Sequence, residues 1–470
     1  MVVEILTGYG RPMTRRARIS TLIAASLGFG IVQLDVTVVN VAVHQIGTAF
    51  GGGVSELQWT VGAYTLMFAA LILSGGALAD RFGARRVLLI GFAVFVVSSM
   101  ACGLAPSMAV LIAARAIQGA GAALLGACSL SLLNHTFPGR HERARALGVW
   151  AAGASTALSG GPVVGGVLIA TLGWRSIFFI NAPIGALGFL LARLDAPETP
   201  RVSRGLDPFG QVAAVIALST FAAALIEAGP HTFTSPLVLA GFALAAVTLP
   251  AFVFIELGSS SPMLPLSMFS NQEFASSTLI GLLVNVCFYG LIFVFSLMFQ
   301  SEHGYSALRA GLAFVPMTAA IMAANLVAGR VANSVGQLRT ILVGLAGMTV
   351  GCVGLLWVGR STPYAGMVSQ QVLLGGGLGL LVPPMTALLL QSAPPERSGV
   401  AAGTLNAMRQ TGSLLGIALF GSLIAGRGQF FSGFHAALGI SLLVLLMASV
   451  LAGVARWRGA VGTCDARTAA

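Results

Sequence analysis

The stretch GALADRFGARRVLLIG, Gly76 to Gly91, decides the architecture of this chain because a related stretch, GRVANSVGQLRTILVG, stands at Gly329 to Gly344. The two copies start 253 residues apart (329 − 76 = 253), and they share glycine at their first, eighth and last positions and arginine at their eleventh. A second set of matching glycines is offset by 255 residues and pairs Gly148, Gly161 and Gly166 with Gly403, Gly416 and Gly421. The repeat predicts two related halves, with chance matching in a chain of 60 glycines as the alternative.

The composition excludes a soluble protein. Of the 470 residues, 56% are hydrophobic and 8% are charged, whereas a soluble domain carries about 25% charged residues. The mean hydropathy of +0.91 also excludes a disordered chain. We therefore expect an all-α membrane protein, whose many glycines let helices approach closely.

Apolar windows bounded by charged and turn residues predict about fourteen membrane spans. Each window is long enough to cross a bilayer, which takes about 20 residues of α-helix. The expected spans are residues 20–43, 58–79, 87–105, 107–129, 146–170, 176–193, 208–228, 236–256, 274–299, 309–329, 338–358, 364–390, 400–425 and 434–455.

The arginines predict the orientation. The chain has no lysine, and 19 of its 25 arginines fall in the loops and ends that share a side with the amino terminus, against four on the other side. Positive residues favour the cytoplasmic side, so both termini are expected there, in a multi-pass protein of the cytoplasmic membrane. The net charge of +11 is thus a topology signal, and no nucleic-acid partner is expected.

The spacing of the repeat predicts a six, two, six arrangement. Six helices with short loops would separate the copies by about 190 residues, and the excess of roughly 60 fits two additional helices. We expect an N-terminal six-helix half at residues 1–193, a linker with two extra helices at 194–265, and a C-terminal six-helix half with a short cytoplasmic tail at 266–470.

The sequence shows no enzyme or cofactor motif. It contains no Walker box, its six histidines have no metal-ligand spacing, and its five cysteines lack C-x-x-C spacing. We expect no nucleotide, metal or other cofactor, so an ion gradient must supply any driving force.

Six segments together resemble the major facilitator superfamily, and within it the 14-helix drug/proton antiporter family, with a similarity to actinobacterial antibiotic-resistance exporters such as the methylenomycin-resistance proteins. They are LDVTVVNVAV (Leu34 to Val43), GALADRFGARR (Gly76 to Arg86), ARAIQGAGAAL (Ala114 to Leu124), SGGPVVGG (Ser159 to Gly166), GWRSIFFINAPIG (Gly173 to Gly185) and GVAAGTLNAMRQTGSLLG (Gly399 to Gly416). One departure is His44, where the family commonly has proline; it is either a proton contact at the outer face or a solvated helix end.

Asp35 and Arg115 are the candidate proton-coupling residues. Asp35 lies deep in the first span, where an ionised carboxylate costs about 2.5–3.5 kcal/mol. Counting 1.5 Å per residue puts both residues about 12–13 Å from the outer ends of their spans. The resemblance associates the RAIQG box, Arg115 to Gly119, with proton transfer. We expect Asp35 to carry the proton and Arg115 to modulate its charge, with a permanent structural pair as the alternative.

The loop after the second span is the candidate conformational gate. Asp80 can accept hydrogen bonds at a helix amino terminus, glycines permit tight turns, and arginines can pair across the interface between the halves. Simple positive-inside retention is the alternative for Arg85 and Arg86. The gate residues are Gly76, Asp80, Arg81, Gly83, Arg85 and Arg86.

The segment SGGPVVGG in the fifth span is the antiporter motif implied by the resemblance. Its proline removes a backbone donor and its glycines expose the backbone, which predicts a bend or a tight seam. Packing of small residues without directional meaning is the alternative. The residues are Gly161, Pro162, Gly165 and Gly166.

Polar residues inside the spans predict a partly polar cavity, although each alone can be an interhelical hydrogen bond. These candidates are Gln118, Asn285, Tyr289, Asn325, Gln370, Asn406 and Arg409.

The sequence thus predicts a monomeric, proton-coupled antiporter that exports small drugs or antibiotics by alternating access. Its partners are a small-molecule drug substrate, protons and the lipid bilayer. A dedicated exporter of one metabolite or self-made antibiotic is the alternative within transport; a receptor on a transporter fold and a membrane-embedded enzyme are the alternatives outside it.

Overall fold

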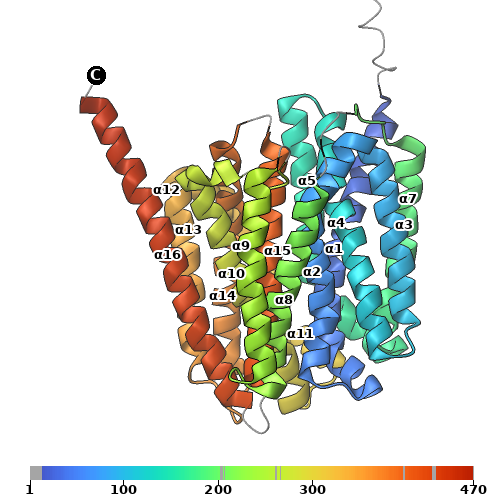
Figure 1. Cartoon of the computed structure of the whole chain (residues 1–470), viewed down its shortest axis with the longest axis vertical. Coiled ribbons are helices and arrows are strands. Elements are labelled where there is room, and N and C mark those ends of the chain that lie inside the picture. The colour runs from blue at the N-terminus through green and yellow to red at the C-terminus, as the bar shows by residue number, and fades with distance from the viewer. Residues whose placement is uncertain are drawn as a thin grey trace, which may run out of the picture.

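The computed structural model describes residues 13–201, 205, 207–259, 262–264, 266–394, 397–425 and 430–468. Throughout these ranges the regular structure is helical, with no strand. The long helices stand side by side along one axis (Figure 1). The predicted all-α membrane fold is confirmed.

The first group of helices, called the first half below, is α1 (Arg15–Phe50), α2 (Val54–Phe82), α3 (Ala84–Gly103), α4 (Met108–Thr136), α5 (Arg140–Leu172), α6 (Ser176–Phe179) and α7 (Asn181–Asp195). Two helices follow, α8 (Pro208–His231) and α9 (Pro236–Gly258). The second half is η1 (Leu266–Ser270), α10 (Gln272–Leu297), η2 (Met298–Glu302), α11 (Ala307–Ala313), α12 (Val315–Val335), α13 (Gln337–Leu355), α14 (Ala365–Ser392), α15 (Ser398–Ile424) and α16 (Phe430–Thr468).

Each of the fourteen expected spans coincides with a helix or with a broken pair, α6–α7 or α11–α12. Within the described residues, thirteen helices are long and apolar enough to cross a membrane. α15 is the exception. It has 27 residues, but Asn406, Arg409 and Gln410 lower its hydropathy.

The two ends of the bundle differ in charge. We call the end where α1 begins and where α2 meets α3 the arginine-rich end, because Arg15, Arg81, Arg85 and Arg330 lie there. It is at the top of Figure 1, and α16 also ends there. The opposite end, which contains the α1–α2 turn at Gly51, is called the far end.

The sequence repeat reappears in the backbone. Gly83 ends α2 and Gly336 ends α12, each with φ of +94°, a conformation that side chains with a Cβ rarely adopt. One close helix crossing also repeats. Gly119 of α4 lies against the Tyr64 carbonyl of α2, and Gly375 of α14 lies against the Met317 carbonyl of α12. The halves therefore share their helix crossings as well as their glycines.

The two additional helices lie over the junction between the halves (Figure 1). Ala222 of α8 packs with Leu66 of α2 and Leu414 of α15. Near the arginine-rich end, Gln211 Nε2 donates to the Ala70 carbonyl of α2 at 3.0 Å. α8 thus contacts both halves, while α9 packs mainly on α8 and is the most exposed span.

Gly375→Ala should destabilise the protein, and Gly376→Ala should not. A Cβ at Gly375 overlaps the Met317 carbonyl oxygen, whereas a Cβ at Gly376 meets nothing within 4 Å. Overpacking of this kind costs about 1–3 kcal/mol. Thermal unfolding in detergent should show a lower midpoint for Gly375→Ala alone, and equal midpoints would contradict the crossing.

Candidate transport site

Asp35 of α1 is buried at the centre of the first half and receives three donors. It is 2% exposed, and Arg115 of α4 is 0% exposed. Arg115 Nη1 pairs with Asp35 Oδ2. The other carboxylate oxygen, Oδ1, accepts from Gln118 Nε2 at 2.9 Å and from Asn181 Nδ2 at 3.1 Å.

Arg115 is fixed by more than the carboxylate. Its Nε donates to the Thr60 carbonyl at 3.1 Å and its Nη1 to Gln118 Oε1 at 2.8 Å. The guanidinium carbon lies 4.2 Å from the centre of the Tyr64 ring, a cation–π contact. Nη2 is buried with no partner among the described residues.

Four helices therefore converge on one charge pair, and sequence reasoning found part of the set. It selected Asp35 and Arg115, and it named Gln118 as a cavity residue. The structure shows that Gln118 contacts both Asp35 and Arg115 directly. It missed Asn181, Tyr64 and Thr60.

Asn181 reaches Asp35 because the sixth span is broken. α6 ends at Phe179 and α7 begins at Asn181. Pro183 supplies the cause, since its ring clashes with the carbonyl four residues earlier, at Phe179. The signal in the sequence was an asparagine two residues before a proline inside an apolar span.

This arrangement links the charge of one carboxylate to several helices. A proton on Asp35 would remove the ion pair and leave the Arg115 cation without its counter-ion. The donors from α4 and α7 would then face a neutral group. The geometry can thus convert a protonation event into a change of helix contacts.

The gate residues lie at the arginine-rich end, between α2 and α3. Ala84 N donates to Thr199 Oγ1 at 2.7 Å, which ties this turn to the segment after α7. Gly76 and Asp80 line a cavity described below. Arg81 and Arg86 are exposed.

Arg85 corrects one expectation. Pairing across the halves was one of the two roles expected for it, but in this conformation it pairs with Glu198 at 3.2 Å and donates to the Arg193 carbonyl at 2.5 Å. Arg193 is in the last turn of α7 and Glu198 follows that helix, so both partners lie within reach of the short α2–α3 turn. In this conformation the Arg85 contacts stay on one side of the interface.

The SGGPVVGG segment forms a tight seam in α5. Gly161 lies against the Thr37 side chain of α1, and Gly165 lies against Val38. Across the halves, Gly311 of α11 packs on the Pro162 carbonyl, and a Cβ at Gly166 would be 2.9 Å from the Ala307 carbonyl oxygen. The small residues therefore bring α5 into contact with both α1 and α11.

Hydrogen bonds between described residues join the halves in the middle of the bundle and toward its far end. They are Gln58 Nε2 to the carbonyls of Ile417 and Ala418 (2.9 and 2.6 Å), Gln300 Nε2 to that of Val41 (3.0 Å), Ser159 Oγ to that of Thr318 (3.3 Å), and Ser296 Oγ to that of Asn40. Beyond them, at the far end, His44 Nδ1 lies 3.1 Å from Ser301 Oγ.

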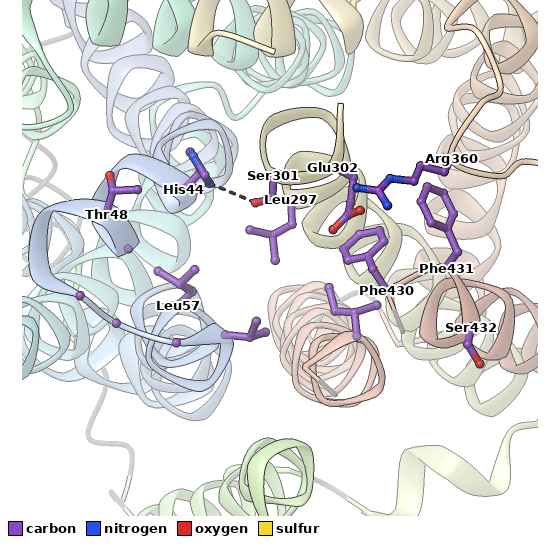
Figure 2. Close-up of a pocket in the computed structure, with 16 residues that line it drawn as sticks. His44, Thr48, Leu57, Leu297, Ser301, Glu302, Arg360, Phe430, Phe431 and Ser432 are labelled. Carbon is purple, nitrogen blue, oxygen red and sulfur yellow. Dashed lines mark hydrogen bonds between the residues drawn. The ribbon is translucent and has the colours of Figure 1, made fainter. Parts of the chain in front are cut away.

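Two sizeable cavities lie on opposite sides of these hydrogen bonds between the halves. One of about 1030 Å³ opens at the far end, where Figure 2 shows His44 bonded to Ser301, with Glu302, Arg360 and Phe430 further along its wall. The other, about 440 Å³, lies on the arginine-rich side between α2, α4 and α15. We call it the inner cavity; Ser74, Asn134, Gln211 and Asn406 contribute polar groups to it.

The remaining cavity candidates divide into two sets. Asn406 lines the inner cavity. Asn285 is buried and donates to its own helix, at the Gly281 carbonyl, at 2.7 Å. Tyr289 is buried within electrostatic range of Tyr64 and Arg409.

Two candidates lie elsewhere. Gln370 accepts from Ser369 Oγ at 2.9 Å and lies beside Gly354 of α13, away from the cavities described above. The amide that is fully buried is its neighbour Gln371. Asn325 of α12 is partly exposed, with its Oδ1 buried and unpartnered among described residues. Gln370 and Gln371 are consecutive in α14, so their side chains point in directions about 100° apart around the helix.

The sequence model described as the Major Facilitator Superfamily matches residues 25–417 of this chain. The chain belongs to that superfamily. It is therefore a multi-pass transporter of the cell membrane rather than an enzyme.

Relatives of this major facilitator protein include named resistance proteins. It is 37% identical over 458 residues to the methylenomycin A resistance protein of Streptomyces coelicolor, covering 97% of this chain and 94% of the relative. It is 36% identical over 411 residues to the multidrug resistance protein Stp of Mycobacterium tuberculosis, covering 87% and 76%. A solved structure, the D-xylose–proton symporter, shares the fold at a TM-score of 0.65, with 16% identity over 92% of this chain and 97% of the other.

Removing Arg115 from this transporter should cost more stability than removing the whole pair. Arg115→Leu leaves the Asp35 carboxylate buried without its counter-ion, which typically costs about 3–5 kcal/mol. The double variant Asp35→Asn with Arg115→Leu should recover part of that loss. Thermal unfolding of both variants and of Asp35→Asn alone measures the coupling; additive effects would mean that the pair is not an energetic unit.

The seam in α5 should tolerate substitution at Gly160 and not at Gly161. A Cβ at Gly160 meets nothing within 4 Å, while one at Gly161 overlaps Thr37. We expect Gly161→Ala to lower transport in membrane vesicles several-fold and Gly160→Ala to leave it unchanged. Equal activity of the two variants would show that α1 and α5 need not pack this tightly.

Proposed function

We propose that this transporter is a proton-coupled antiporter that exports small amphipathic compounds, antibiotics among them, from the cytoplasm. The observation that carries the proposal is the buried Asp35 carboxylate, held by Arg115, Gln118 and Asn181 among the spans of the first half. Ionisable groups at that depth mark ion and substrate pathways. The relatives named for antibiotic and multidrug resistance support the export of such compounds.

The proposed cycle alternates the access of one central site. With the arginine-rich end in the cytoplasm, the inner cavity faces inward. The hydrogen bonds between the halves, in the middle of the bundle and toward its far end, close the outer route. A compound enters while Asp35 is ionised. After the halves rearrange, the compound leaves and a proton enters from outside and neutralises Asp35. The protonated carrier returns and releases the proton to the cytoplasm, which ionises Asp35 again.

The driving force is the proton gradient. Each charge moved across the membrane gains about 2.3 kcal/mol per 100 mV, in addition to the pH term. Because Asp35 is 2% exposed in this conformation, each proton exchange requires a rearrangement that opens a path from the carboxylate to water. The single chain is the proposed transport unit.

Substrate breadth separates two versions of the proposal. A relative named for methylenomycin A favours a dedicated exporter of one antibiotic or metabolite, and one named for multidrug resistance favours a broad pump. The same membrane machinery serves both. A resistance spectrum over many compounds distinguishes them.

Asp35→Asn should abolish proton-driven export and leave membrane insertion intact. The amide keeps the shape of the carboxylate but cannot carry the proton. We expect candidate compounds to release protons from acidified inside-out vesicles that contain the wild-type protein, read with a pH-reporting dye, and not from those with Asp35→Asn.

Glu273→Gln is the matched control, because this exposed carboxylate at the start of α10 undergoes the same chemical change. It should release protons like the wild type. Normal proton release by Asp35→Asn would remove Asp35 from the coupling mechanism.

A further inference from the structure

Arg409 is a partly exposed cation inside the bundle, and it has no acidic partner among the described residues. It is the twelfth residue of α15 (Ser398–Ile424), about 17 Å from the start of the helix. Its stem packs against Gly281 of α10, and its Nε is buried with no hydrogen-bond partner among the described residues. Arg115, by contrast, has Asp35.

The other acids of the described spans have partners or lie near the ends of helices. Glu227 pairs with His231 at 3.5 Å, and Glu256 accepts from Leu264 N at 3.1 Å. Asp80 lines the inner cavity and has an interaction of its own. The centre of the bundle therefore keeps one surplus positive charge when Asp35 is ionised.

The face of α15 that lines the inner cavity leads to Arg409. Gly399, Ala402, Gly403 and Asn406 line the cavity. These positions follow the three- and four-residue spacing of one helix face, and Arg409 is the next in the series. The cavity of about 440 Å³ is within the range of small-ligand sites, and Arg409 lies beyond its deep end.

We propose that the compound bound in the inner cavity carries an anionic group, a carboxylate or an acid of similar geometry, that pairs with Arg409. The inference rests on the proposed export function and specifies its substrate class. A guanidinium is a planar fork that binds a carboxylate through two parallel hydrogen bonds. An unpaired cation in the membrane interior is costly, and an anionic substrate neutralises it.

A tyrosine lies near each of the two charged sites. Tyr64 stacks on Arg115, and Tyr289 lies within electrostatic range of both Tyr64 and Arg409. If an anion leaves while a proton enters, both movements carry positive charge inward. Export of an acid should therefore depend more strongly on the membrane potential than export of a neutral compound.

Binding to the purified protein tests the substrate class without requiring proton coupling. The probes are dansyl-glycine, which is anionic, dansylamide, which is neutral, and a dansyl conjugate of a quaternary ammonium, which is cationic. Their fluorescence on binding gives a Kd for each. We expect dansyl-glycine to bind wild-type protein about tenfold more tightly than dansylamide, and the cation to bind most weakly.

Three variants test whether the preference for the carboxylate probe depends on Arg409. Arg409→Gln should lose the preference for dansyl-glycine, Arg409→Lys should keep part of it, and Arg330→Gln, which removes an exposed arginine at the end of α12, should behave like wild type. If Arg409→Gln does not fold, the wild-type order of the three probes still decides. Any result in which the carboxylate probe does not bind wild-type protein best overturns the proposal.

The two proposals fail separately. A carboxylate preference that depends on Arg409, together with normal proton release by Asp35→Asn, would retain the substrate class and reject the proton site. Loss of coupling in Asp35→Asn without any carboxylate preference would do the reverse.

Discussion

The ion pair between Asp35 and Arg115 is the interaction on which the first half depends. Neither side chain can remain in the membrane interior alone, because an unpaired buried charge costs several kcal/mol. The pair is satisfied by groups from α2, α4 and α7 as well as by each other. A change in the charge of Asp35 would therefore alter the contacts of four helices at once, as the proposed proton coupling requires.

Close packing of backbones is the second constraint. Membrane helices gain little from burial of apolar surface, since lipid is equally apolar, so they associate through small residues and interhelical hydrogen bonds. The glycines at 119 and 375 place corresponding carbonyls of the two halves against them. At the junction, Gly166 and Gly311 do the same between α5 and α11. Contacts of this kind are either made or lost, which suits a protein that alternates between two arrangements.

Much of this structure could be predicted from the sequence, for physical reasons. Hydropathy predicted the spans, and the repeat aligned Gly83 with Gly336, the glycines at which α2 and α12 end. Helix rise predicted that Asp35 and Arg115 lie at equal depth. What could not be predicted depends on helix rotation and breaks. Choosing Gln371 over Gln370 needs the orientation of α14 to within one residue. Finding Asn181 needs the break before α7, and the partner of Arg85 depends on where the chain after α7 runs.

The most direct test of the account is infrared difference spectroscopy of the purified protein as the pH is changed. The carbonyl stretch of a protonated carboxylic acid is separate from that of a carboxylate, so it reports the protonation of a buried acid. The account predicts a protonated-acid band in wild-type protein that is absent in Asp35→Asn and decreases when a transported compound binds. A band that persists in Asp35→Asn, or one that no transported compound changes, would contradict the account.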